Sequence, residues 1–399
     1  MINAYHDVHI IDGTGQSFTG YLVVQDSRIL DVGPGKLPEG MKADSVRDLS
    51  GLALLPGMID CHVHLYSDGD ANPAATRQEP APLSALRAAR NAMRTVQGGI
   101  TTVRDCGSRD GVDFALRRAA QEKLCVAPRM LLCGCMICMT GGHGVGSGIE
   151  ADGPEGVRKA ARQMLKQGAD HIKLVASGGI LSQGTEIGAA QFTVEEMRAG
   201  VEEAHRAGKT ACAHAHGATA IKNAIQAGVD SIEHGYLIDD EGIDMMVDRG
   251  TYLVATSIAV RNVVKHGVDA GIPEHSVRKA SSAIDQHIQG FGKALAAGVK
   301  MAMGTDSGVP FTRHGRNLEE LACLVEMGMS PMQAIMTATL HSAGLLQREN
   351  EIGSLEKGKL ADFIVVRGDP LKDISVLSRQ ENIRSVFIGG ESVYEQEGV

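Results

Sequence analysis

The middle of the chain, from about residue 55 to residue 348, alternates between short apolar runs and segments with helical spacing. Eight strand–helix alternations over roughly 300 residues predict an α/β fold of the (β/α)8 TIM-barrel type. A doubly wound open sheet is the alternative, but no G-x-G-x-x-G motif follows the first run, which removes that fold's commonest function. The eight runs are Leu54–Val63, Thr101–Val103, Met130–Cys133, Ile172–Val175, Thr210–Ala213, Ser231–Glu233, Tyr252–Ala255 and Met301–Met303.

Two of the segments that follow the runs carry apolar residues three or four positions apart. This spacing places side chains on one face of a helix and therefore predicts two amphipathic helices. The residues concerned are Leu86, Ala89, Met93 and Val96 in the first segment, and Leu318, Leu321 and Val325 in the second.

Both ends of the chain read as short strands separated by Gly, Pro and Asp. Gly389 and Gly390 stand between two such strands and predict a hairpin turn. Strand-rich ends around a different middle predict a small β-sandwich domain formed by residues 1–55 and 350–399, beside a barrel domain over 56–349. The expected strands include Tyr21–Val24, Arg28–Val32, Asp362–Val366 and Ile383–Ile388.

Composition excludes several classes of protein. Hydrophobic residues make up 43% of the 399 residues and charged residues 22%, which is typical of a globular protein. The net charge of -9 argues against nucleic-acid binding, and no apolar run is long enough to cross a membrane. The first ten residues lack the pattern of a secretory signal. We expect a cytoplasmic protein with a small-molecule substrate, and leave a homo-oligomer open.

The chain has eight cysteines, most of them within apolar runs. The cluster Cys133, Cys135 and Cys138 suggests a metal site, but zinc usually takes four ligands, commonly as two separated pairs. No second pair follows. We therefore expect reduced thiols in the core rather than a cysteine metal site.

The first apolar run ends in His62-Val63-His64. Residues two apart on a strand point to the same face, so both imidazoles can reach one ion, and barrel chemistry lies at the carboxyl ends of strands. The fourth run contains Lys173, and burying an ammonium costs several kcal/mol unless it is paired or neutralised. Lys173 is either paired with a carboxylate or bridges two metal ions as a carbamate.

Three further runs end in residues that bind metals: His214-Ala215-His216, Glu233-His234 and Thr305-Asp306. A lone histidine at a strand end is more often structural. Here, however, four of the eight strand ends carry His or Asp, and a fifth strand carries Lys173. Taken together, these residues predict a metal site. Imidazole with carboxylate suits zinc or a similar divalent ion.

These residues resemble the amidohydrolase superfamily, in the family's order and over nearly the whole chain. The return of the chain to the terminal strands also resembles the family. The matching elements are Leu55–His64, Lys173, His214, Ser231–Gly235, Gly304–Asp306 and Ile352–Asp362.

The resemblance implies a site for two divalent ions, for which zinc is the first choice. His62 and His64 would bind the more buried ion, and Lys173, carboxylated by CO2, would bridge both. His214 and His234 would bind the more exposed ion; His214 is preferred to His216 because it occupies the family's usual position. Asp306 would bind the buried ion and act as the catalytic acid and base.

A closer resemblance is to the branch of prolidase-type and Xaa-Arg dipeptidase (arginine carboxypeptidase-type) amidohydrolases. It is carried by Thr140–Gly144, Ala176–Gly179 and His214–Gly217. It implies that His143 hydrogen-bonds the scissile carbonyl oxygen. The other candidates for substrate binding are His216, Tyr66, Ser177 and Tyr236, with Arg261, Arg313 and His314 as a lid or a carboxylate clamp.

The expected function is metal-dependent hydrolysis of an amide or peptide bond in a dipeptide or an N-acyl amino acid. Alternatives within the superfamily are a mycotoxin or xenobiotic amidase, a lactonase, a phosphotriesterase or a deaminase. A deaminase fits less well because it usually uses one ion, whereas Lys173 suits a bridge between two. A non-catalytic barrel is the alternative of another class, and the presence of all six expected ligands argues against it.

Overall fold

The computed structural model describes residues 1–73 and 78–396. The strands are β1 (Ile2–Ile11), β2 (Ser17–Gln25), β3 (Arg28–Pro34), β4 (Ser45–Asp48), β5 (Leu52–Pro56), β6 (Met58–Val63), β7 (Ile100–Asp105), β8 (Arg129–Leu132), β9 (Ile137–Cys138), β10 (Ile149–Glu150), β11 (His171–Val175), β12 (Thr210–Gly217), β13 (Ser231–Leu237), β14 (Tyr252–Val254), β15 (Phe363–Arg367), β16 (Ile383–Ile388) and β17 (Glu391–Glu395). The α-helices are α1 (Ala81–Gln97), α2 (Val112–Gln121), α3 (Gly153–Gln167), α4 (Val194–Arg206), α5 (Ala218–Ala227), α6 (Asp240–Arg249), α7 (Ser257–His266), α8 (Glu274–Ala296), α9 (Glu319–Glu326), α10 (Pro331–Thr337) and α11 (Leu340–Leu345). Short 3-10 helices cover Val268–Ala270, Ile374–Ser378 and Gln380–Asn382.

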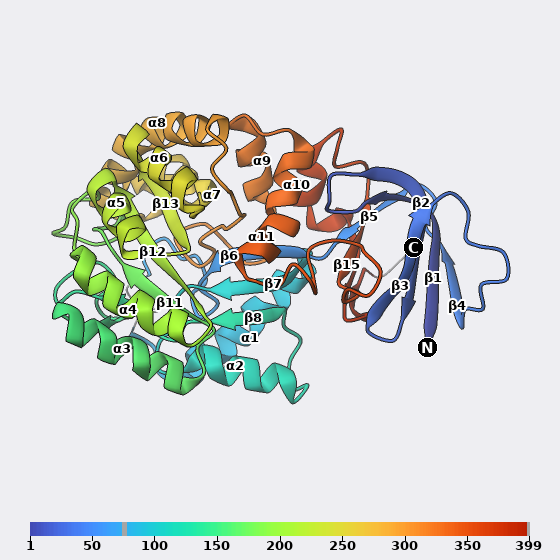
Figure 1. Cartoon of the computed structure of the whole chain (residues 1–399), viewed down its shortest axis with the longest axis horizontal. Helices are drawn as coiled ribbons and strands as arrows, with labels where there is room; N and C mark the ends of the chain where they lie inside the picture. Colours follow the sequence, from blue (N-terminus) through green and yellow to red (C-terminus); the bar gives the residue numbers. More distant parts are fainter. Residues whose placement is uncertain (74–77, 397–399) are drawn as a thin grey trace.

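Strands from both ends of the chain form one sheet, at the right of Figure 1. Its order is β17-β16-β15-β5-β1-β2-β3, and β4 also pairs with β1. Tyr5 meets Phe363 edge to face at 5.2 Å in its core, and the predicted Gly389-Gly390 turn joins β16 to β17 with positive φ at both residues. The strand pairing defines a single sheet, so the β-sandwich and the domain boundaries stay predictions.

The middle of the chain is α/β, as predicted, with parallel strands and helices outside them (Figure 1). Strands β6-β7-β8 form one sheet and β10-β9-β11-β12-β13-β14 form another. Segment 300–307 lies between β14 and β6. Its Lys300 carbonyl accepts from Leu253 N–H at 2.8 Å, its Met303 carbonyl accepts from Cys61 N–H at 2.9 Å, and only isolated bridges mark the expected eighth strand.

Helix α1 forms where the spacing predicts it, but its buried face differs from the expected one. Leu86 is 72% exposed and Met93 is 43% exposed. Polar groups explain the difference, because Asn91 Nδ2 donates to the Leu65 carbonyl at 2.9 Å and Thr95 contacts the ring of His314. The helix therefore holds the loop after β6 with hydrogen bonds. Leu86 and Met93 of the predicted stripe face outward, whereas Val96 is buried in the core.

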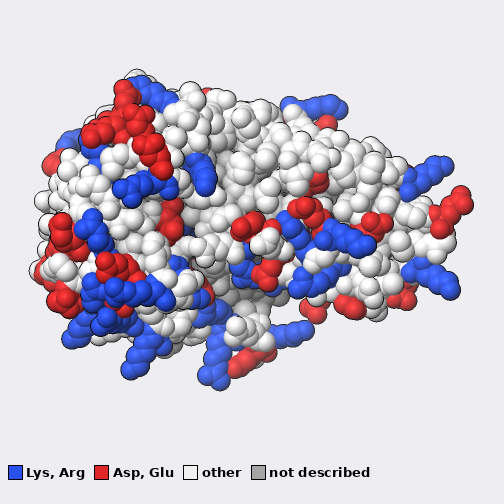
Figure 2. Space-filling view, in the orientation of Figure 1, with Lys and Arg blue, Asp and Glu red and all other residues white. Residues whose placement is uncertain are grey.

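The eight cysteines are free, as predicted, and the cluster at Cys133, Cys135 and Cys138 belongs to none of the candidate metal groups among the described residues. No helix in the described ranges is both long and apolar enough to cross a bilayer. On the face shown in Figure 2, basic and acidic side chains alternate rather than gathering into one field.

Candidate active site

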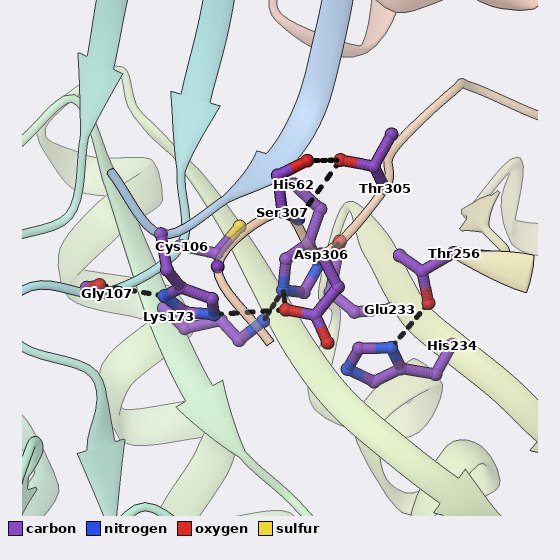
Figure 3. Close-up of polar contacts among 12 residues, drawn as sticks. His62, Cys106, Gly107, Lys173, Glu233, His234, Thr256, Thr305, Asp306 and Ser307 are labelled. Carbon is purple, nitrogen blue, oxygen red and sulfur yellow. Dashed lines mark hydrogen bonds and ion pairs between the residues drawn. The ribbon is translucent and has the colours of Figure 1, made fainter. Parts of the chain in front are cut away.

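One cavity lies at the carboxyl ends of the parallel strands, where the sequence places the metal ligands. β6, β11, β12 and β13 each direct side chains into it, and segment 300–307 closes the gap between β14 and β6. Figure 3 shows how the side chains of His62, Lys173, His234 and Asp306 converge. All six predicted ligands line this cavity: His62, His64, Lys173, His214, His234 and Asp306.

The first group of candidate ligands is His62, His64 and Asp306, whose ligand atoms all lie within 4.8 Å of one another. Asp306 Oδ1 is 3.5 Å from His62 Nε2 and 3.3 Å from His64 Nε2, and it is buried without a hydrogen-bond partner among the described atoms. Burial opposes charge on this carboxyl, but the two imidazoles and Lys173 lower its pKa to about 2. A buried carboxylate beside two ring nitrogens fits a divalent cation.

The second group is His214, His216 and His234, also within 4.8 Å. Burial, together with repulsion from neighbouring imidazoles and from Lys173, lowers the pKa of all three rings well below the ordinary histidine value, so the rings stay neutral. Neutral imidazoles present lone pairs, which is the donor chemistry of a zinc site. Because His216 lies in the same group, the preference for His214 over His216 stays a prediction.

Partners at the outer ring nitrogens fix the orientation of three of these histidines. His62 Nδ1 lies 2.7 Å from Glu233 Oε2, and His64 Nδ1 donates to the Gly107 carbonyl at 2.8 Å. His234 Nδ1 lies 2.7 Å from Thr256 Oγ1, a contact visible in Figure 3. The Nε2 atoms are thereby directed to the cavity side.

Backbone strain accompanies this arrangement. His234, Thr256 and Asp306 adopt positive φ angles of 74°, 48° and 59°, which non-glycine residues rarely adopt and which cluster at functional sites. Asp60 helps to hold Asp306 in place, because its carboxylate accepts from the backbone N–H groups of His62 at 3.0 Å and Thr305 at 3.1 Å.

His143 reaches the cavity from the loop after β9, and its ring centroid lies 4.4 Å from that of His214. Tyr66, His216 and Tyr236 line the cavity as predicted. Ser177 does not line it: within the described structure its hydroxyl donates to the Gly178 carbonyl and accepts from His216 N–H. Its predicted contact with substrate therefore gains no support from the cavity.

The amidohydrolase family profile matches residues 53–393. The chain belongs to the amidohydrolase family. It is 30% identical to ochratoxinase of Aspergillus niger, over 96% of this chain and 84% of the relative. A Xaa-Pro dipeptidase solved with methionine in its active site superposes with a TM-score of 0.91 at 37% identity, covering 99% of this chain and all (100%) of the other. A prolidase in complex with N-methylphosphonate-L-proline superposes with a TM-score of 0.91 at 30% sequence identity. The match covers 99% of this chain and 100% of the prolidase.

The protein is therefore a metal-binding hydrolase of the amidohydrolase superfamily, related in structure to prolidases. Arg104 was missed from the sequence altogether, and Glu233 was named only as part of a strand end, without its supporting role. Glu233 Oε1 accepts from Arg104 Nη2 at 2.7 Å and from Ser231 Oγ at 2.6 Å, while its other oxygen holds His62. Both charged side chains are buried, and a buried Arg and a buried Glu in two otherwise apolar strands are a signal that each needs the other.

Replacing Arg104 by Met should destabilise this amidohydrolase by about 3–5 kcal/mol, because it leaves the Glu233 carboxylate buried without its cation. Denaturant unfolding of the metal-free protein measures the change. Arg118→Met is the matched control, since Arg118 is 80% exposed and pairs only with Glu122 at the surface. Equal stabilities for the two variants would contradict the role assigned to Arg104.

The three residues suggested as a lid or carboxylate clamp lie outside the described lining of the cavity, so that role stays a prediction. Arg261 forms an ion pair with Glu326, and His314 Nε2 donates to the carbonyl oxygens of His64 and Ser67. Burial lowers the pKa of His314 to about 4, so it is neutral. Neither of them, nor Arg313, is among the described residues that line the cavity.

Proposed function

We propose that this amidohydrolase cleaves the amide or peptide bond of a dipeptide or an N-acyl amino acid. The observation that carries the proposal is the single cavity in which both candidate ligand groups meet His143. The prolidase-like structural relatives and ochratoxinase, an amide hydrolase, support the same reaction class.

Two divalent ions, with zinc as the first choice, would be held by six side chains. His62, His64 and Asp306 would hold one ion, and His214 with His234 would hold the other. Lys173, carboxylated by CO2, would bridge them. When bound, the ions supply a water of lowered pKa and polarise the scissile carbonyl.

The protein's own groups would move the protons and orient the substrate. Asp306 accepts the proton of the attacking water and returns it to the leaving nitrogen, as a general base and then a general acid. His143 donates a hydrogen bond to the carbonyl oxygen as charge develops on it. The buried walls around these groups exclude bulk water, which strengthens both interactions.

The aliphatic part of the cavity lining favours an apolar group on the substrate. Aliphatic side chains cover its walls, and burying an apolar acyl group or side chain against them is favourable by about 25 cal/mol per Å². We propose that the preferred substrates carry such a group next to the scissile bond. The aliphatic lining residues include Ile180, Leu181, Val260, Val263 and Val309.

A substrate panel tests the function. Zinc-loaded protein is assayed against dipeptides and N-acyl amino acids with apolar, polar and charged groups, against lactones and phosphotriesters, and for ammonia release from amino heterocycles. Metal content is measured alongside. Amide hydrolysis with two ions per chain is the expected result. Activity confined to the esters would overturn the proposal, and one ion per chain with ammonia release would indicate a deaminase.

Replacing Val260 by Thr should raise KM for an apolar amide substrate about tenfold with little change in kcat, because the added hydroxyl loses water without gaining a partner in the apolar wall. Steady-state kinetics on the best apolar and the best polar substrate measure it. Val247→Thr, on the exposed face of α6, is the control. The same KM change for the polar substrate would count against an apolar subsite.

We also propose that the two parallel sheets and segment 300–307 together form the (β/α)8 barrel, and that the terminal sheet corresponds to a β-sandwich domain of residues 1–55 and 350–399. The backbone bonds of segment 300–307 to β14 and β6 support the first statement, as does the Asp170 N–H bond to the Leu132 carbonyl at 2.7 Å, between β11 and β8.

A further inference from the structure

The loop after β11, residues 177–190, is closed by a buried lysine that comes from α8. Lys279 is only 2% exposed. Its ammonium donates to the carbonyl oxygens of Gly179 at 3.2 Å and Ser182 at 2.7 Å, and also to that of Thr185. An ammonium has three N–H donors, so three carbonyls of one loop satisfy all of them. A buried ammonium that donates its hydrogen bonds to backbone carbonyls indicates that it stabilises the conformation of this loop.

The same loop holds the ring of His143 on two sides. Ser182 Oγ lies 2.6 Å from His143 Nδ1. Gly179 lies against the ring: a Cβ at this position would stand 2.3 Å from His143 Cε1. Only glycine leaves room for the ring there. The loop thus sets both the tilt of the imidazole and the partner of one of its nitrogens.

We propose that Lys279 and Ser182 are positioning residues for His143. Lys279 closes the loop through its three carbonyls, and the closed loop presents the Ser182 hydroxyl to Nδ1. Ser182 donates its proton to Nδ1, so the ring proton resides on Nε2, where His143 needs it as a donor. The catalytic part of this inference rests on the proposed function, in which His143 donates to the scissile carbonyl.

The chemistry of the ammonium explains why a lysine stands at position 279. Its three N–H donors form a trigonal pyramid around one nitrogen atom and meet the three carbonyls that surround it. A guanidinium directs its donors in a planar fork, which suits two parallel acceptors and does not match this arrangement. Arginine at position 279 should therefore fail to restore the loop even though it keeps the charge.

The first experiment compares Lys279→Met, Lys279→Arg and wild-type enzyme loaded with zinc, with Lys293→Met as control. Lys293 lies on the same helix and pairs with Asp240 at the surface. Hydrogen exchange is followed at the amides of Gly178 and Ala189, which bond within the loop. Both Lys279 variants should exchange there about tenfold faster or more, with unchanged metal content. Unchanged exchange in Lys279→Met would overturn the closing role of Lys279.

The second experiment removes and restores the hydroxyl at position 182. Ser182→Ala should lower kcat about 10–100-fold with KM nearly unchanged, and Ser182→Thr should recover most of the loss, as expected for the orienting partner of a functional histidine. Nitrogen-15 NMR of His143 in zinc-loaded enzyme should show the proton on Nε2 in wild type and in Ser182→Thr, and a mixture of tautomers in Ser182→Ala. A proton on Nδ1 in wild type, or an identical spectrum for Ser182→Ala, would overturn the proposal.

These readouts separate the two proposals. If the wild-type enzyme cleaves no amide, the proposed function fails, while the exchange rates and the NMR spectra still decide whether the loop holds His143. If amides are cleaved and Ser182→Ala keeps full kcat, the proposed function stands and the positioning role fails.

Discussion

Replacing Asp306 by Asn should leave the metal content close to that of the wild type and lower kcat about 10²–10⁴-fold. The amide keeps the size of the side chain and one oxygen that can still face His62 and His64. The amide cannot accept a proton at pH 7. The attacking water therefore has no general base, and the leaving nitrogen has no general acid. Turnover of the best amide substrate, with metal analysis of the same sample, measures the effect.

Asp240→Asn provides the matched control, because Asp240 is exposed and its carboxylate pairs only with Lys293 among the described residues. Loss of metal together with activity in Asp306→Asn would mean that the carboxylate acts chiefly as a ligand. Near-normal turnover with full metal content would falsify its role in proton transfer.

The six candidate ligands were predictable because each stands at or near the end of an apolar run, and parallel strands bring their carboxyl ends to one side. His62 and His64 share a face by simple alternation. Separating His214 from His216 was not possible in this way, since both lie on β12 with the same alternation and both reach the second group. The spacing of residues along a strand predicts which face a side chain points to. It does not predict the distances between ligand atoms, and these determine which histidine binds an ion.

The supporting residues were harder to predict because they act across long separations in sequence. Arg104 and Glu233 lie on β7 and β13, and only their unusual charge in apolar strands hinted at a pair. Lys279 contacts a loop about one hundred residues earlier, and nothing in the loop's sequence marks a cation as its partner. The exposure of Leu86 and Met93 on α1 shows the converse error, because the hydrogen bonds of Asn91 helped to decide which face of the helix turned inward.

Replacing Lys173 by Met should lower the metal content below two ions per chain and lower kcat at least as much as the Asp306 change. The side chain lies in β11, is 3% exposed, and its Nζ stands 3.5 Å from His62 Nε2. A carboxylated lysine supplies an oxygen to each ion, and methionine of similar length supplies none. Lys209→Met, on the surface beside Asp170, is the control. Full metal loading of Lys173→Met would exclude a bridging role.

The charge on Lys173 adds a second test of the same bridge. Burial opposes its ammonium, but Cys106 and Cys212, followed by the carboxyl groups of Glu233 and Asp306, raise the pKa of Lys173 above the ordinary lysine value. CO2 reacts only with the neutral amine, so the metal-free protein should resist carboxylation. Cations entering the site repel the ammonium and favour the carbamate, which couples uptake of metal to uptake of CO2. Zinc reconstitution should therefore restore activity several-fold faster with bicarbonate than in CO2-free buffer, and Lys173→Met should show no such dependence. Equal rates in both buffers for the wild type would remove the carbamate from the mechanism.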